Sequence, residues 1–139
     1  MPLIRERLAA GQSVRLEPRG TSMLPMLRQG LDSVTLSPLP QRLKKYDLPL
    51  YQRRDGHYVL HRIVEAGECY TCMGDNQFQP EPGLRHEQMI ALVTAFSRGG
   101  REYSVEQPAY RLYCRLWHWS RPLRRIWRGV KSRLRRMLK

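Results

Sequence analysis

The chain has 139 residues, with 25 Lys or Arg against 12 Asp or Glu, and a formal net charge of +13. This length suits one domain with a core of modest size. No stretch approaches the roughly 20 apolar residues of a membrane-spanning helix, and residues 1–7 lack the apolar run of a signal peptide.

Short elements follow one another along the first hundred residues. Residues 2–10 predict a short helix that ends at Gly11. Residues 13–18 alternate polar and apolar side chains, which is typical of a half-buried strand. Further strands are expected at 33–37, 47–52, 57–65, 69–73 and 89–96. This pattern predicts a mainly β fold, in which residues 1–106 form a compact, curled, barrel-like domain of short strands with a short N-terminal helix.

Residues 107–139 are expected to form a basic, amphipathic, helical tail. Residues 110–139 contain 11 basic residues and no acidic one, so this segment carries most of the net charge. Pro122 divides it, because an internal proline ends or kinks a helix. Beyond Pro122, apolar side chains recur at helical spacing on one face and arginines occupy the other.

This tail has three possible partners. A basic amphipathic helix flanked by tryptophan is typical of segments that lie in an anionic membrane surface. Arginine-rich helices also bind nucleic acid through phosphates, and an apolar face can pack on a partner protein. The tryptophans and the continuous apolar face favour the membrane, so we expect a peripheral protein on the cytoplasmic face of the membrane.

The three cysteines give no sign of a metal site. Cys69 and Cys72 form a C-x-x-C string, but the chain has no second ligand pair at suitable spacing. On a strand, residues three apart point to opposite faces, which also argues against a disulfide. Free thiols, with Cys114 as the third, fit a reducing cytoplasm. No metal or other cofactor is implied.

Three short strings carry candidate chemistry. They are G-T-S-M-L-P at 20–25, L-H-R-I-V at 60–64 and M-G-D-N at 73–76. A serine hydroxyl needs an adjacent base to take its proton, and the base usually needs a third group to orient it. Ser22 and His61 are therefore the candidate nucleophile and base of one small domain.

Taken together, these strings resemble the superfamily of signal peptidases and LexA-type serine peptidases, over roughly residues 12–100. The resemblance implies a serine peptidase with Ser22 as nucleophile and His61 as base. Bacterial leader peptidases and LexA-type proteins have lysine at the base position, so the chain is more similar to the histidine-type signal peptidases of archaea and the endoplasmic reticulum. A curled β fold agrees with what the resemblance implies.

The chain departs from the family pattern at two points. Gly20 stands where many signal peptidases have a serine that donates to the oxyanion, so the backbone N–H groups of Ser22 and Met23 are the expected donors. The group that orients the base is open between two acids. We favour Asp75 of the G-D-N string, but Glu81 falls where the family has a later aspartate.

The sequence therefore predicts an endopeptidase that cleaves a leader or precursor peptide bound as an extended strand. Two alternatives remain. One is a non-catalytic peptide-binding module that keeps the fold, and the other is a self-cleaving, LexA-like regulator with a nucleic-acid-binding tail. The identity of the substrate and the oligomeric state are left open by the sequence.

Overall fold

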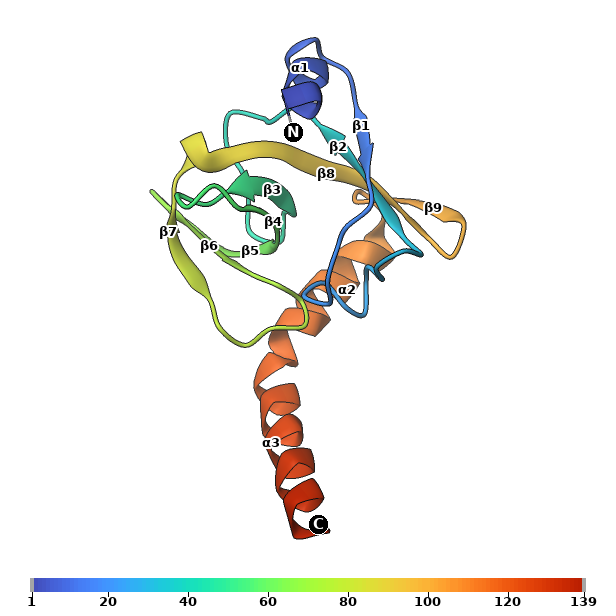
Figure 1. Ribbon diagram of the computed structural model, residues 1–139, viewed down its shortest axis with the longest axis vertical. Helices are drawn as coiled ribbons and strands as arrows, with labels where there is room; N and C mark the ends of the chain where they lie inside the picture. The colour runs from blue at the N-terminus through green and yellow to red at the C-terminus, as the bar shows by residue number, and fades with distance from the viewer. Residues whose placement is uncertain (1, 139) are drawn as a thin grey trace.

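The computed structural model describes residues 2–138, and its body is built from two antiparallel sheets (Figure 1). The larger sheet has the order β1-β2-β8-β3-β4, with β9 paired to β8, and the smaller has the order β5-β6-β7. The strands are β1 (Val14–Leu16), β2 (Ser33–Ser37), β3 (Pro49–Gln52), β4 (Tyr58–Leu60), β5 (Arg62–Ala66), β6 (Tyr70–Met73), β7 (Glu81–Leu84), β8 (Met89–Arg98) and β9 (Arg101–Ser104). The helices are α1 (Pro2–Ala9), α2 (Pro108–Trp119) and α3 (Arg121–Met137).

The large sheet curls into a half-barrel around the core, which confirms the expected mainly β, barrel-like domain with a short N-terminal helix. Strand β8 is the long central strand, and β2 and β3 each pair with it through a register shift. Such bulges bend a strand and increase its twist. The inward side chains of β2, β3 and β8 are apolar and almost fully buried.

The single strand expected at 57–65 is divided in two. Strand β4 belongs to the large sheet, whereas β5 belongs to the small one, and His61 is the residue between them. The chain therefore passes from one sheet to the other at the candidate base. Strand β7 was not expected, because its sequence E-P-G-L resembles a turn.

Residues 107–139, which were expected to form one helical tail divided at Pro122, form two helices in different surroundings. Helix α2 buries Tyr110 and Cys114 in the main core, so it is part of the folded body. Helix α3 projects away from the body (Figure 1), and residues 125–138 are all exposed. The helices are separated at Ser120, and Pro122 lies in the first turn of α3, where it costs no hydrogen bond. Within residues 2–138, no helix is long and apolar enough to cross a membrane.

Candidate active site

Ser22 and His61, which are 39 positions apart in the sequence, line one cleft of about 850 Å³. The cleft lies between the two edges of the large sheet, because its lining includes Leu16 at the end of β1 and residues 58–60 of β4. Among the strands of residues 2–138, β1 and β4 each pair with one neighbour only. The remaining walls are mixed: Met23, Leu27 and Leu50 supply apolar surface, and polar side chains supply the rest, namely Glu17, Arg19, Gln29, Arg53 and Gln77.

The loop that follows β6 holds the segment of the candidate nucleophile. The Asn76 backbone N–H donates to the Ser22 carbonyl at 2.8 Å, and the Asn76 side-chain amide donates to the Thr21 carbonyl at 3.1 Å. Gly74 lies so close that a Cβ atom there would be 2.5 Å from the Ser22 carbonyl oxygen. The glycine of the G-D-N string is therefore a site residue that the sequence analysis missed, since it considered only the aspartate.

The backbone N–H groups of Ser22 and Met23 are not bonded to other parts of the described chain. The N–H of Gly20 is used differently, because it donates to the side chain of Gln29 at 2.8 Å. Gly20 also has φ of +82°, a backbone conformation that a serine would adopt only with strain. The arrangement leaves the two expected backbone groups available to an oxyanion.

A chain of hydrogen bonds connects His61 to Glu81 through Tyr51. The Tyr51 hydroxyl donates to Glu81 Oε1 at 2.7 Å and lies 3.4 Å from His61 Nδ1. A phenol has only one proton, so the oxygen that donates to Glu81 must accept from His61. Nδ1 then carries the imidazole proton, and Nε2 keeps its lone pair. That is the tautomer a general base requires.

The environment of His61 keeps it neutral. The side chain is only 6 % exposed, and this burial lowers the pKa of His61 to about 4, with the positive charge of Arg53 adding to the effect. The negative charges of Glu81 and Asp75 oppose it. Within the described residues the His61 ring bonds only Tyr51. Catalytic hydrogen bonds are often loose without substrate and tighten when it binds.

Glu81 is held in its ionised form by a second partner. Arg53 donates to both of its carboxylate oxygens, at 2.9 and 3.1 Å. Burial alone would raise the pKa of Glu81, but the hydrogen bonds from Arg53 and Tyr51 outweigh burial and lower it. An ionised Glu81 can only accept hydrogen bonds, which fixes the direction of the Tyr51 bond.

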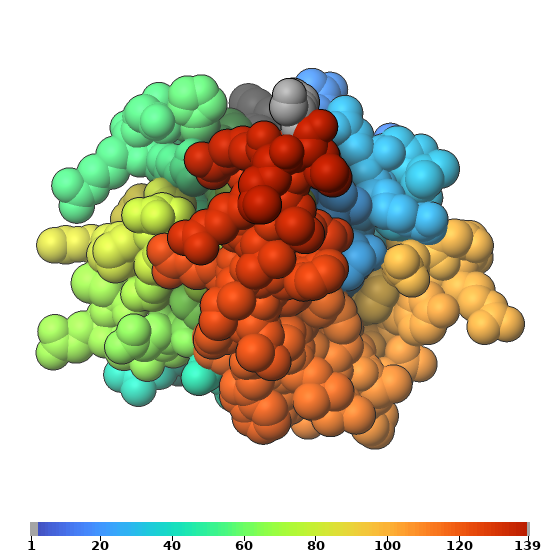
Figure 2. Space-filling model, turned by 90° about the horizontal axis from the view of Figure 1, so that it is seen from below, coloured from blue at the N-terminus to red at the C-terminus, as the bar shows by residue number. Residues whose placement is uncertain are grey.

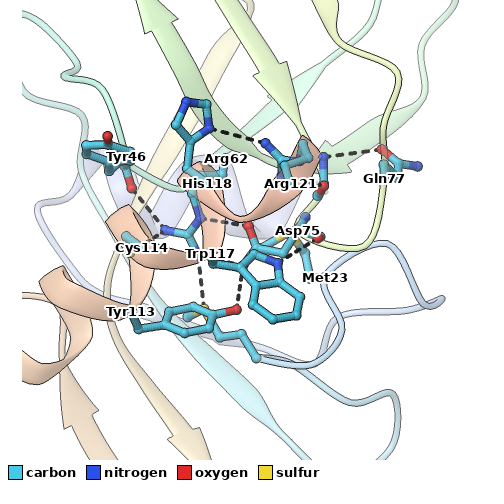
Figure 3. A network of polar contacts seen from close by, with 12 residues as sticks. Met23, Tyr46, Arg62, Asp75, Gln77, Tyr113, Cys114, Trp117, His118 and Arg121 are labelled. Carbon is cyan, nitrogen blue, oxygen red and sulfur yellow. Dashed lines mark hydrogen bonds and ion pairs between the residues drawn. The ribbon is translucent and has the colours of Figure 1, made fainter. Parts of the chain in front are cut away.

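Asp75, the acid we favoured from the sequence, does not contact His61. Its carboxylate is fully buried and paired with Arg62, whose nitrogens donate to its two oxygens at 2.8 and 3.0 Å (Figure 3). Tyr113 of α2 donates to the same carboxylate at 3.0 Å. A buried carboxylate is tolerated only with such compensation, and these bonds engage both of its oxygens. Of the two candidate acids, Glu81 is the one that a chain of hydrogen bonds connects to His61.

Arg62 also attaches α2 to the body. Its remaining donor capacity goes to the Tyr46 carbonyl, the Tyr110 hydroxyl and the sulfur atoms of Met26 and Cys114. Helix α2 also bonds directly to the loop that follows β6, since Trp117 of α2 donates to the Asp75 carbonyl at 2.7 Å (Figure 3). Helix α2 thereby holds the loop that positions Ser22.

No metal centre accompanies this site in the described part of the chain, where no three His, Cys, Asp or Glu side chains are grouped as metal ligands. Comparison of the chain with known protein families, with curated proteins and with solved structures finds no match. A function for the chain therefore has to follow from the chemistry of the cleft.

Proposed function

We propose that this protein is a serine endopeptidase similar to the histidine-type signal peptidases. One observation carries the proposal: Ser22 and a neutral, buried His61 line the same cleft, beside two unused backbone N–H groups. A nucleophile, a base and an oxyanion site are the parts that acyl transfer needs.

In the proposed reaction, Ser22 Oγ attacks the carbonyl carbon of the scissile peptide bond and His61 Nε2 takes the hydroxyl proton. The N–H groups of Ser22 and Met23 stabilise the negative charge on the carbonyl oxygen. His61 then donates the proton to the leaving amine, which departs and leaves an acyl-enzyme on Ser22. Water attacks this ester with His61 as base, and the acid product and free Ser22 are released. Glu81, acting through Tyr51, stabilises the imidazolium that forms in each step.

The substrate is a leader or precursor peptide bound as an extended strand. The unpaired edges of β1 and β4 flank the cleft, and a peptide laid between them gains backbone hydrogen bonds from an edge strand. The apolar lining by Leu27 and Leu50 suits apolar side chains of that peptide.

We also propose that α3 attaches the enzyme to the cytoplasmic face of a membrane. Its apolar side is exposed along the whole helix, with Ile126 at 64 % and Leu134 at 50 % exposure, and its other sides are basic. Burial of that apolar side and attraction to anionic lipid act in the same direction, and each cation near the surface contributes about 1 kcal/mol.

The catalytic proposal is tested with Ser22→Ala and His61→Ala on a quenched fluorescent peptide library. Each variant should lose all measurable cleavage, and the double variant should lose no more, because nucleophile and base act as a unit. Circular dichroism should show the fold retained. Turnover near that of the wild type in His61→Ala would refute the assignment of the base.

The membrane proposal is tested by co-sedimentation with vesicles. The wild type should bind vesicles containing phosphatidylglycerol and bind pure phosphatidylcholine weakly. Ile126→Asn with Leu134→Asn should reduce binding to both, because the change removes apolar burial and leaves the charge unchanged. Tight binding to duplex DNA without binding to anionic vesicles would assign α3 to nucleic acid instead.

A further inference from the structure

A second hollow leads from the cleft to α3. The hollow has a volume of about 510 Å³ and shares His61, Arg53 and Gln77 with the lining of the cleft. The rest of its lining is Arg128 of α3 and residues 76–82, which include Phe78 and the Glu81 that is paired with Arg53. A chain that leaves the cleft past His61 would therefore reach α3.

A groove continues from that hollow along one flank of α3. It has a volume of about 680 Å³ and shares Phe78 and Arg128 with the hollow. Arg124, Lys131 and Arg135 extend the lining along the helix. Figure 2, seen from below the view of Figure 1, shows α3 in front of the body.

The groove carries uncompensated positive charge. Its lining contains no acidic residue, and within residues 2–138 none of its four cations forms an ion pair. Phe78 does not neutralise this charge, although Arg128 lies 5.3 Å from the centre of its ring. A groove with cations and no counter-charge favours an anionic ligand.

The cations on α3 fall on two flanks that differ in position. At 100° per residue, Arg128, Lys131 and Arg135 lie on the flank that lines the groove, whereas Arg125, Arg133 and Arg136 lie on the opposite flank. The apolar side lies between the two flanks on one side of the helix, and Ser132 lies between them on the other. The cations of the first flank (the inner cations) thus line the groove that leads from the cleft through the hollow, whereas the outer cations do not line it.

We infer that the inner flank of α3 is a substrate site for an acidic segment of the polypeptide, adjoining the residues bound in the cleft. The inference rests on the proposed peptidase function and adds a substrate class to it: peptides with several Asp or Glu on the side of the scissile bond that leaves past His61. From Arg128 to Arg135 the helix rises about 10 Å, which matches about three residues of an extended chain.

Binding tests this inference without cleavage. The probes are two fluorescein-labelled apolar peptides of equal length, one ending in Asp-Glu-Asp and the other in Asn-Gln-Asn, bound to full-length Ser22→Ala protein and measured by fluorescence anisotropy. We expect the acidic peptide to bind about tenfold more tightly, which is the sum of a few exposed ion pairs. Equal binding of the two peptides would overturn the inference.

Matched variants of α3 locate the site. The inner variant, Arg128→Gln/Lys131→Gln/Arg135→Gln, should lose the preference for the acidic peptide. The outer variant, Arg125→Gln/Arg133→Gln/Arg136→Gln, should keep the preference, although it also loses three charges. An equal loss in both would show attraction to the overall charge and overturn the site. Loss of anionic-vesicle binding in the inner variant alone, with the peptide preference intact, would assign the flank to lipid.

Cleavage separates this inference from the peptidase proposal. If the wild type cleaves no library peptide, the proposed peptidase function fails, and the anisotropy result still decides the acidic site. If it cleaves, an acidic block added to a cleaved peptide should raise kcat/KM about tenfold in the wild type and the outer variant, and leave it unchanged in the inner variant. The same gain in all three proteins would contradict the site.

Discussion

His61 and Arg62 are neighbours in the sequence and both are buried, but their polar atoms are satisfied to different degrees. Every side-chain nitrogen of Arg62 donates a hydrogen bond, two of them to Asp75. Within the described residues, the His61 side chain makes one hydrogen bond, from Nδ1 at 3.4 Å, and its Nε2 makes none. A buried charge whose polar atoms are all hydrogen-bonded, such as Arg62, stabilises the fold. A buried titratable group with few hydrogen bonds, such as His61, has a shifted pKa and keeps an atom free for chemistry.

The two acids differ in the same way. Asp75 is fully buried and bonded to Arg62 and Tyr113, so it belongs to the contact between the body and α2. Glu81 is half-buried at the side of the cleft, and its bond to Tyr51 reaches the imidazole. We therefore expect changes at Asp75 to affect stability and changes at Glu81 to affect catalysis.

The largest expected effect is that of Asp75→Asn on stability. The change leaves Arg62 charged and buried without its counter-ion, and breaking such a pair costs about 3–5 kcal/mol of unfolding free energy. Guanidinium unfolding measures it. Glu102→Gln, which breaks the exposed pair with Arg15, should cost less than about 1 kcal/mol. Unchanged stability with abolished turnover would instead return Asp75 to the catalytic site.

Gly74→Ala tests the catalytic part of this comparison and should lower the rate of the proposed reaction at Ser22. The new Cβ would be 2.5 Å from the Ser22 carbonyl oxygen, so the nucleophile segment must move. A displacement of this size can cost about 100-fold in kcat. Gly67→Ala is the matched control, because its Cβ would meet its nearest atom at 3.9 Å. Equal kcat values in the two variants would show that the loop does not position Ser22.

Part of this arrangement could be predicted from the sequence. Alternation and turn residues locate most strands, and Pro122 divides the C-terminal helices. Side chains on neighbouring strand positions point to opposite sides, so His61 and Arg62 could have been assigned to different environments. Tyr110, Cys114 and Trp117 follow helical spacing, and this stripe was a signal that α2 packs against the body.

The rest depends on contacts between distant segments. Asp75 meets Arg62 because β5 and β6 pair with Arg62 opposite Met73, and no local pattern specifies that register. The link from Tyr51 to Glu81 joins β3 of one sheet to β7 of the other. Strand β7 was not predicted, because it contains Pro82 and Gly83, which are typical turn residues.

The incomplete pairing of His61 should also make stability depend on pH. Its pKa is about 4 in the folded protein and 6.5 in the unfolded chain, so between these values the unfolded state binds the extra proton. Stability is therefore fully present above pH 6.5 and is lost as pH falls toward 4. From pH 8 to pH 5 the loss is about 2 kcal/mol.

Urea unfolding of the wild type and His61→Gln at pH 8 and pH 5 measures this contribution. His61→Gln should lose less stability on acidification, by about 2 kcal/mol. Burial also lowers the pKa of His118, so some dependence on pH should remain in the variant. The exposed His57→Gln serves as a control and should behave as the wild type. Identical slopes in wild type and His61→Gln would show that His61 titrates normally.

The smallest expected effect separates the two charges beside His61. Arg53 lowers the pKa of His61 and Glu81 raises it. Arg53→Gln should therefore move the acid limb of the kcat/KM profile to higher pH and Glu81→Gln should move it to lower pH, each by a fraction of a unit at these partly exposed positions. Glu81→Gln and Tyr51→Phe should also lower the plateau that kcat/KM reaches above the acid limb, because the imidazole of His61 loses its orientation. Shifts of the limb in the same direction in Arg53→Gln and Glu81→Gln would mean that the ion pair does not act on His61, and would remove Glu81 from the site.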